Sequence, residues 1–327
     1  TASAGKFLTE RLTIYPDYAV DLDRWAHQDL HVRVLEMIDA EGFPRIDEWC
    51  PGDVDIAPPA EVMNAIVNTP RHVSADIAAL LDKASAGEEL DEAEIIRLFQ
   101  SRGDDFTAVV QRADALRAQT NGNSVSFVVN RNINYTNICY FKCQFCAFSK
   151  GKLSENLRGR PYDLSDEEIA RRTTEAWERG ATEVCMQGGI HPEYTGETYI
   201  NIVRAVKTAQ PDMHVHAFSP LEVWQGAATL KMEIGEYLQK LKDVGLNTLP
   251  GTAAEILDDE VREIICADKI NTQQWLDVME SAHSVGYKTT ATIMYGHVEK
   301  LEHWARHILR VRDLQERTGG FTEFVPL

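Results

Sequence analysis

Long apolar runs are absent from this chain of 327 residues. No stretch of about 18 consecutive apolar residues occurs, so a transmembrane helix is not expected. The first residues contain no basic segment followed by an apolar one, which is the pattern of a secretory signal peptide. A starting Met is also absent, so we expect the natural N-terminus to lie further upstream. These absences predict a cytoplasmic protein without a membrane partner.

Basic residues are also scarce. The sequence has 33 Lys and Arg against 51 Asp and Glu, which gives a formal net charge of −18. An acidic protein repels the phosphates of nucleic acids and of anionic lipids, so neither is expected as the main partner. We interpret the excess of acid as favouring solubility, and it identifies no partner by itself.

Cysteine is rare, and half of the cysteines are clustered. Of six cysteines, Cys139, Cys143 and Cys146 lie within eight residues of one another. A disulfide framework would spread its cysteines more evenly through a small secreted chain. The cluster therefore indicates metal or redox chemistry. No chemical role is assigned to the scattered cysteines, which are Cys50, Cys185 and Cys266.

The first third of the chain differs from the rest. Residues 1–56 are rich in aromatic and charged residues, and we interpret them as the tail of a preceding module with its linker. Residues 57–122 are expected to form a helical extension. Asp91 and Glu94 have the spacing of a capping box at the start of a helix, and residues 103–105 are expected to interrupt the helical pattern.

From residue 123 onward, short strand patterns alternate with helical ones, as in α/β folds. A capping box at residues 165–168 is expected to open one of these helices. Six such strands predict a parallel sheet, and closure into a TIM-like β/α barrel is its economical form. The last strand pattern reaches the end of the sequence, so we expect a barrel truncated after about six strands. The predicted strands are residues 126–129, 183–187, 214–218, 247–249, 289–294 and 322–325.

Glycine and polar residues follow these strand patterns directly. In β/α barrels the carboxyl ends of the strands carry the active site, so these residues are expected to meet at one edge. They are Gly188-Gly189, Ser219-Pro220, Pro250-Gly251-Thr252 and Gly296-His297.

The clustered cysteines have the spacing C-x3-C-x2-C, and thiolates are the usual ligands of iron–sulfur clusters. Three ligands from one short loop can hold three irons of a cubane and leave the fourth iron open for another ligand. The alternative is structural zinc, which needs four protein ligands. No second C-x2-C pair occurs in the sequence. We therefore predict a 4Fe-4S cluster on Cys139, Cys143 and Cys146.

This motif after the first barrel strand resembles that of the radical S-adenosylmethionine (SAM) superfamily. Within the superfamily, the chain resembles the FO synthase family, which makes a deazaflavin chromophore, and in particular its second module, a tyrosine 4-hydroxyphenyl transferase. Residues 7–53 resemble the end of the first module and the linker of the fused form. The segments that carry the resemblance to the second module are residues 130–137, 186–192, 214–220, 250–257, 294–299 and 318–327.

The resemblance implies a role for several residues around the cluster. SAM would bind the open iron and be cleaved to a 5′-deoxyadenosyl radical. Gly188 and Gly189 would face the SAM amino group, and Glu299 would contact its adenine and ribose. Phe145 would lie near the adenine, although it is also explained as a packing aromatic. Glu299 is equally explained as a carboxylate at a helix N-terminus.

The implied substrates are L-tyrosine and 5-amino-6-(D-ribitylamino)uracil, and both carry many hydrogen-bonding groups. The radical would take a hydrogen atom from tyrosine, and the hydroxybenzyl fragment would join the uracil ring. His297 is the preferred catalytic candidate because imidazole can move a proton near neutral pH. The other catalytic candidates are Tyr295 and Glu255. The substrate-binding candidates are His216, Ser219, Glu222 and Thr252.

The resemblance also implies a low-potential electron donor and the preceding radical SAM module as partners. Two other functions stay open on the sequence. One is another radical SAM enzyme, of the menaquinone or biotin type. The other is a non-catalytic iron–sulfur electron carrier, which requires a fourth protein ligand and does not cleave SAM.

Overall fold

The computed structural model describes residues 22–25, 28–36, 70–146 and 161–327. The chain divides into two units, Thr1–Asn68 and Thr69–Leu327, which are treated separately. The first unit contributes helices α3 (Leu22–Trp25) and α4 (Gln28–Glu36). The boundary expected near residue 56, and also Cys50, lie outside the described residues. In the described part of the chain, no helix combines the length and the apolar character that crossing a membrane requires.

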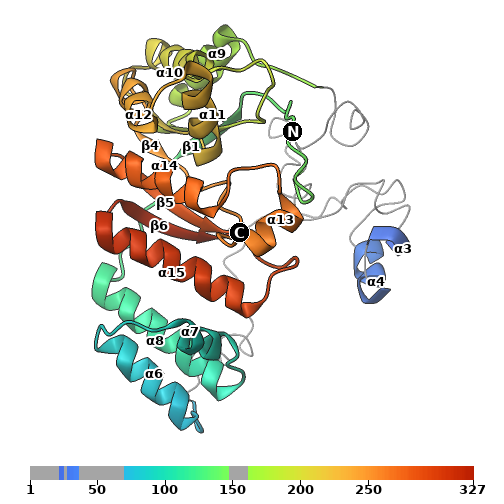
Figure 1. The fold of residues 1–327 in the computed structure, drawn as a ribbon, viewed down its shortest axis with the longest axis vertical. Helices are drawn as coiled ribbons and strands as arrows, with labels where there is room; N and C mark the ends of the chain where they lie inside the picture. Colours follow the sequence, from blue (N-terminus) through green and yellow to red (C-terminus); the bar gives the residue numbers. More distant parts are fainter. Residues whose placement is uncertain (1–21, 26–27, 37–69, 147–160) are drawn as a thin grey trace. The chain divides into compact units, whose positions relative to one another are not determined.

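The helices of the second unit that precede the sheet are α6 (Ala75–Ser85), α7 (Glu92–Phe99) and α8 (Asp104–Asn121). The predicted capping box is confirmed. The Asp91 carboxylate accepts a hydrogen bond from the backbone N–H of Glu94 at 2.9 Å, and the Glu94 carboxylate accepts one from the N–H of Asp91 at 2.8 Å. Helix α7 packs against α15 (Leu301–Thr318) (Figure 1). Phe99 meets Trp304 edge to face at this contact.

The interruption predicted at residues 103–105 is wrong for the two aspartates. Gly103 precedes α8 with a φ of 59°, whereas Asp104 and Asp105 belong to the first turn of the helix. Acidic side chains are favourable there because the N-terminal end of a helix dipole is positive. The Asp105 carboxylate also accepts hydrogen bonds from the backbone N–H and the hydroxyl of Ser74, which ties α8 to the start of α6.

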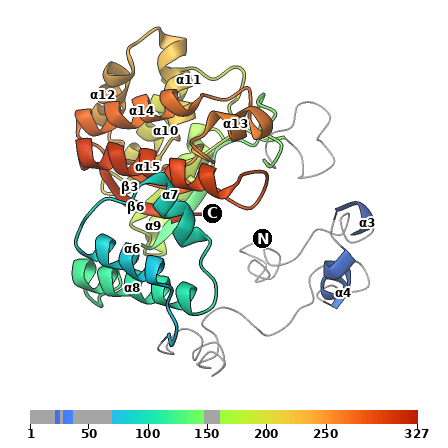
Figure 2. The same ribbon diagram turned by 60° about the horizontal axis from the view of Figure 1, so that its bottom comes forward.

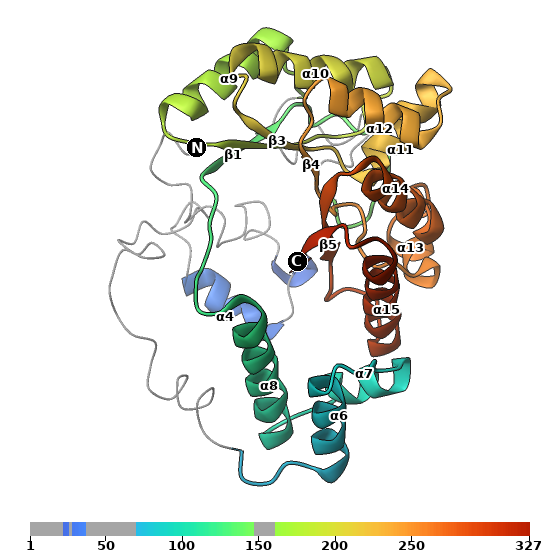
Figure 3. The same cartoon turned by 90° about the vertical axis from the view of Figure 1, so that its left-hand side faces the viewer.

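The six strands form one parallel sheet in the order β1-β2-β3-β4-β5-β6, with helices between successive strands (Figure 1). This confirms the predicted α/β architecture. Strands β1 and β6 do not pair within the described residues, so the sheet is open between them (Figure 3). The strands are β1 (Asn130–Asn134), β2 (Glu183–Gln187), β3 (His214–Ala217), β4 (Thr248–Leu249), β5 (Lys288–Ile293) and β6 (Phe321–Pro326). The helices are α9 (Asp166–Glu178), α10 (Gly196–Ala209), α11 (Pro220–Leu230), α12 (Ile234–Asp243), α13 (Asp259–Ile265), α14 (Thr272–Val285) and α15.

The first predicted strand is wrong, whereas the other five agree with the structure to within one or two residues. Residues 126–129 have high β propensity but form no strand, and Phe127 is 87% exposed. The strand begins at Asn130, because residues 130–134 pair in register with residues 183–187 of β2. Pairing with a neighbour therefore overrides the local propensity of the preceding apolar residues.

The two faces of the sheet differ in chemistry. Ile133, Val184, Met186, Val215 and Ala217 alternate along β1, β2 and β3 and are buried in one hydrophobic cluster with residues of α9, α10 and α12. The helices cover this outer face of the sheet (Figures 1 and 2). The residues between them are mostly polar and lie on the opposite, inner face.

Helix α9 shows only half of its predicted capping box. The Ser165 hydroxyl accepts a hydrogen bond from the backbone N–H of Glu168 at 3.3 Å. The Glu168 carboxylate does not complete the box, because it pairs with Arg171 and Arg172 on the next turn. The helix ends before Gly180, whose φ of 85° suits a residue without a side chain.

Gly320, just before β6, provides a test of the packing at this edge. A Cβ at this position would lie 2.1 Å from the ring of His283, and that ring is held by Thr289 and Thr318. We expect Gly320→Ala to lower the free energy of unfolding by about 1–3 kcal/mol, the usual cost of overpacking. Urea unfolding followed by circular dichroism measures the change.

The matched control is Gly235→Ala in α12, where a Cβ would meet nothing within 4 Å. Because alanine favours helix over glycine, this variant is expected to be neutral or more stable by up to about 1 kcal/mol. Equal effects of the two substitutions would contradict the proposed role of the His283 ring.

Candidate active site

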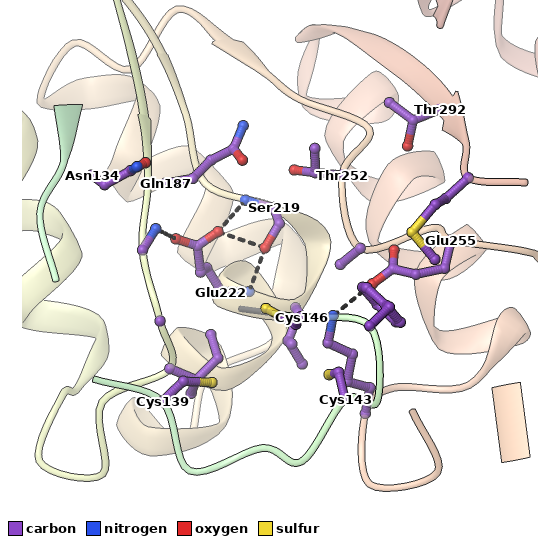
Figure 4. A pocket seen from close by; sticks show the side chains of 18 of the residues that line it. Asn134, Cys139, Cys143, Cys146, Gln187, Ser219, Glu222, Thr252, Glu255 and Thr292 are labelled. Carbon is purple, nitrogen blue, oxygen red and sulfur yellow. Dashed lines mark hydrogen bonds and ion pairs between the residues drawn. The ribbon is translucent and has the colours of Figure 1, made fainter. Parts of the chain in front are cut away.

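One pocket of about 270 Å³ opens at the carboxyl ends of the strands (Figure 4). Ten of the residues predicted from the sequence line it, although they come from four separate segments of the chain. These residues are Cys139, Cys143, Phe145, Cys146, Gly188, Gly189, Ser219, Glu222, Thr252 and Glu255.

The three cysteines lie on the loop that follows β1, and backbone contacts fix this loop. The N–H of Tyr140 donates to the carbonyl of Ile190 at 3.1 Å, on the loop after β2. The N–H of Gln144 donates to the carbonyl of Ile265 at 2.9 Å, at the end of α13. Anchors on both sides of Cys143 therefore hold the loop against two other segments and direct its thiols to the pocket.

The thiols lie in an environment suited to a bound metal cluster. Burial raises the pKa of Cys143 to about 12 and also raises the pKa of Cys139. Buried thiols of this kind lose their protons when a metal binds them. Among the described residues that line the pocket there is no fourth cysteine and no histidine. The donor set therefore fits a cluster held by three thiolates with one position left for another ligand.

A second group of possible metal ligands occurs outside the pocket, at Asp258, Glu260 and His303. Asp258 is already paired with two guanidinium groups, at 2.7 Å from Arg306 and 3.1 Å from Arg310. These two positive charges neutralise the carboxylates, so a cation gains little there. We interpret this group as an ion-pair network.

Gly188 and Gly189 follow β2 and pack closely against the segment that leads to the cysteines. A Cβ on Gly188 would lie 2.4 Å from the ring of Tyr135, and a Cβ on Gly189 would lie 2.2 Å from the carbonyl oxygen of Ile138. Packing alone therefore requires glycine at both positions. Their predicted contact with SAM stays a prediction.

Glu222 is 1% exposed and accepts hydrogen bonds from several donors at once. The backbone N–H and the hydroxyl of Ser219 donate to it at 2.6 and 2.5 Å (Figure 4). The N–H of Gly188 donates at 3.2 Å, and the hydroxyl of Tyr135 donates as well. Burial raises the pKa of this carboxyl group, and the hydrogen bonds act in the opposite direction. Glu222 and Ser219 thus join the carboxyl ends of β1, β2 and β3 beside the pocket.

Lys269 lines the pocket and was not predicted from the sequence. Its ammonium group lies 2.6 Å from the Glu255 carboxylate, and the two side chains are only 11% and 8% exposed. Burial lowers the pKa of Lys269, but the charge and hydrogen bond of Glu255, together with the nearby Cys143 and Cys266, outweigh it and the net shift is upward. The ammonium nitrogen also lies 5.5 Å from the centre of the Phe145 ring, a cation–π distance.

Lys269 lies outside every local pattern that the sequence analysis used. It follows α13 rather than a strand, and no motif marks it. It meets Glu255 because the chain between them folds back through α13.

Arg262 of α13 holds the backbone on both sides of this ion pair. The residue is 3% exposed, and its guanidinium group donates to the carbonyls of Ala254 and Ile270, both at 2.5 Å, with longer contacts to Ala253 and Ile256. The segment that it binds includes Glu255, whose φ of 45° is unusual for a residue with a side chain. The Arg262 contacts hold this strained turn in place.

Four predicted site residues do not line the pocket. His216 on β3 bonds to the hydroxyl of Thr248 at 2.7 Å. Tyr295 is 53% exposed and meets Trp304 edge to face. His297 and Glu299 pair with each other at 2.8 Å, in the loop after β5.

Glu299 is occupied by contacts within its own loop. Its carboxylate accepts hydrogen bonds from the backbone N–H groups of Gly296 and His297 and from the indole of Trp304. Burial raises its pKa, but these bonds prevail and lower it to about 2. The geometry agrees with the alternative interpretation of a carboxylate just before a helix, and its contact with SAM stays a prediction.

Comparison with known proteins identifies the class. Residues 133–311 match the radical SAM superfamily model, and the chain belongs to this superfamily. It is 17% identical to the solved structure of HydG, a maturase of the FeFe-hydrogenase, with a TM-score of 0.59 over 82% of this chain and 57% of that chain. Methylornithine synthase (PylB) gives 20% identity and a TM-score of 0.54 over 76% and 68% of the two chains. At these identities the two structures show a shared fold alone.

Two kinds of named relatives are much more similar in sequence. The chain is 42% identical to the FO synthase of Mycobacterium leprae, over 100% of this chain and 42% of the relative. It is 46% identical to the 5-amino-6-(D-ribitylamino)uracil–L-tyrosine 4-hydroxyphenyl transferase of Methanocaldococcus jannaschii, over 73% of this chain and 66% of the relative. The chain therefore spans less than half of the FO synthase that it matches.

The Arg262 contacts lead to a testable prediction. We expect Arg262→Met to leave buried carbonyls without hydrogen-bond donors. The free energy of unfolding is expected to fall by about 1–3 kcal/mol or more. Because the carbonyls lie beside Glu255, limited proteolysis is expected to cleave the 251–258 loop faster than in the wild type. Mass spectrometry of the fragments locates the cut.

Lys207→Met is the matched control. Lys207 also donates to the carbonyl of a buried residue, Met213, but this carbonyl lies at the amino end of β3, away from the pocket. This variant is expected to lose stability without faster cleavage of the 251–258 loop. Cleavage at the same new site in both variants would show that Arg262 does not hold the loop specifically.

Proposed function

We propose that the chain is the tyrosine 4-hydroxyphenyl transferase module of a deazaflavin-forming FO synthase. The observation that carries the proposal is the three-cysteine loop on a pocket with no further thiol among its described residues. The similarity to the Methanocaldococcus jannaschii transferase supports the substrates, L-tyrosine and 5-amino-6-(D-ribitylamino)uracil. The preceding radical SAM module and a low-potential electron donor are proposed partners.

The proposed cofactors are a 4Fe-4S cluster on Cys139, Cys143 and Cys146 and a SAM molecule in the same pocket. Together they supply a carbon-centred radical by reductive cleavage of the sulfonium of SAM. The residues of the chain bind and orient the reactants around that radical.

The charged residues of the pocket suit amino-acid groups. SAM and tyrosine each carry an ammonium and a carboxylate, and burying these charges is costly without opposite charges nearby. Lys269 and Glu255 offer one charge of each sign at the pocket wall. The proposed role of Glu255 in the reaction is therefore to orient the substrate that it binds.

Thr252 is a second proposed ligand contact. Its hydroxyl is buried and has no hydrogen-bond partner among the described residues, although it lines the pocket (Figure 4). Unpartnered buried hydroxyl groups are uncommon in folded proteins, so a bound molecule is the natural partner for this one.

The apolar part of the pocket wall would exclude water. Ile190, Leu221, Ala253 and Met294 line it beside the cysteines. A site closed to water protects a reactive radical from side reactions and strengthens the electrostatic contacts within it. Tyr295, His297 and Glu299 lie on the loop after β5, and their proposed roles require this loop to approach the bound reactants.

The proposal predicts iron binding and tyrosine-dependent cleavage of SAM. After anaerobic reconstitution, the chain is expected to hold about four irons and to form 5′-deoxyadenosine with dithionite and SAM, at a rate that tyrosine increases. Adding the diaminouracil is expected to yield the hydroxybenzyl adduct. Iron analysis measures the cluster content. Liquid chromatography with mass spectrometry measures 5′-deoxyadenosine and the hydroxybenzyl adduct.

Cys143→Ala is expected to lose the cluster and to reduce 5′-deoxyadenosine to the background level. Cys266→Ala is the matched control, because Cys266 is equally buried but does not line the pocket. Zinc in place of iron, or a cluster with four protein ligands that leaves SAM intact, would contradict the proposal. SAM cleavage that tyrosine does not stimulate would agree with the proposed cluster but exclude tyrosine as the substrate.

A further inference from the structure

A row of uncharged polar side chains lies on the inner face of the sheet, next to the pocket. Asn134 and Gln187 are register partners on β1 and β2, and both line the pocket (Figure 4). Two residues back along the same strands, Asn132 pairs with Cys185. The register continues across β3 and β4. We call these four residues the polar row: Asn132, Cys185, His216 and Thr248.

The polar row shares the face of the sheet that the pocket occupies. Side chains alternate along a strand, and the intervening Ile133, Val184 and Val215 are buried on the outer face against the helices. Successive side chains on one face are roughly 6.6 Å apart along a strand. The polar row therefore begins one such step below Asn134 and Gln187.

None of the four side chains is charged at neutral pH. Burial raises the pKa of Cys185 to about 11, and burial together with the neighbouring His214 lowers the pKa of His216 to about 4. Asn132 and Thr248 carry no ionisable group. The polar row thus differs from the pocket wall at Lys269 and Glu255, which carries one charge of each sign.

The hydrogen bonds around Thr248 assign a proton to His216. Nε2 of His214 lies 2.9 Å from the Thr248 hydroxyl and 3.8 Å from the Glu183 carboxylate, which favours a proton on that nitrogen. The single hydroxyl hydrogen of Thr248 is then donated to Nδ1 of His216 at 2.7 Å. In a neutral ring, Nε2 of His216 consequently carries the other proton and acts as a donor.

We propose that the polar row binds the ribityl side chain of 5-amino-6-(D-ribitylamino)uracil, whereas the amino-acid groups of the other reactants bind at Lys269 and Glu255. This inference rests on the proposed function and assigns the two substrates to different walls of one site. A polyol needs donors and acceptors but no counter-charge, and an amide, a thiol, a hydroxyl and an imidazole provide both. The zwitterion of tyrosine would lose hydration on this uncharged surface without gaining an ion pair.

The test compares two uracil substrates, one with the ribityl chain and one, 5,6-diaminouracil, without it. In the wild-type protein kcat/KM is expected to favour the ribityl substrate. Thr248→Val removes the hydroxyl that orients His216 while keeping the side-chain shape. It is expected to reduce this preference about 5-fold, the effect of one lost hydrogen bond of about 1 kcal/mol.

Asn132→Ala is the second variant, and it is expected to keep its fold because the Asn132 side chain is exposed. It is expected to reduce the same preference by a similar factor. In both variants the KM for tyrosine is expected to change less than about twofold, and so is the formation of 5′-deoxyadenosine from SAM in the presence of tyrosine alone. The reason is that neither tyrosine nor SAM would contact the polar row.

Thr318→Val is the matched control. The Thr318 hydroxyl also bonds to a histidine, at 2.7 Å from Nδ1 of His283, but lies away from the pocket. It is expected to alter stability and to leave the substrate preference unchanged.

Three results would overturn the inference: an unchanged preference in both polar-row variants, a reduced preference in Thr318→Val of equal size, or a rise in the KM for tyrosine in place of that for the uracil. The last result would place tyrosine on the polar row. Absence of any adduct in the wild-type protein would contradict the proposed function instead, so the two failures are distinguishable.

Discussion

The buried carboxylate of Glu222 is the interaction on which the site depends. It accepts hydrogen bonds from Tyr135 after β1, from Gly188 after β2 and from Ser219 after β3. A carboxylate without water needs several donors, and three neighbouring strands can supply them only if their carboxyl ends are in register. The same alignment brings the cysteine loop against the turn after β2. One buried carboxyl group thus couples the sheet, the glycine pair and the cysteine loop.

The pocket and the polar row next to it offer two kinds of surface that suit different chemistry. The wall at Lys269 and Glu255 carries paired charges, and the strained turn that holds Glu255 is stabilised by Arg262. The polar row on the inner face of β1 to β4 is uncharged, because burial keeps Cys185 and His216 in their neutral forms. Under the proposed function, this difference would direct the zwitterionic and the polyhydroxylated reactants to separate walls.

Much of the architecture follows from local patterns, and the exceptions are instructive. Residues 183–187 were predicted as a strand with the bounds that the structure has, because their apolar and polar residues alternate between two distinct faces. The prediction at residues 126–129 was wrong, since strand pairing selects the polar segment 130–134, which places Ile133 in the core. The clustered cysteines, predicted as ligands from their spacing, all line the pocket, whereas His216, Tyr295, His297 and Glu299 follow strands without reaching it.

The sequence by itself determined the order of strands and helices, the three-thiol motif and the glycine pair, because each depends on residues close together in the chain. Only the tertiary structure decided which distant residues meet. The Lys269–Glu255 pair requires the chain to fold back through α13, and the row of Asn132, Cys185, His216 and Thr248 requires the register of four strands. Such contacts depend on pairing and packing between segments, and no local pattern encodes them.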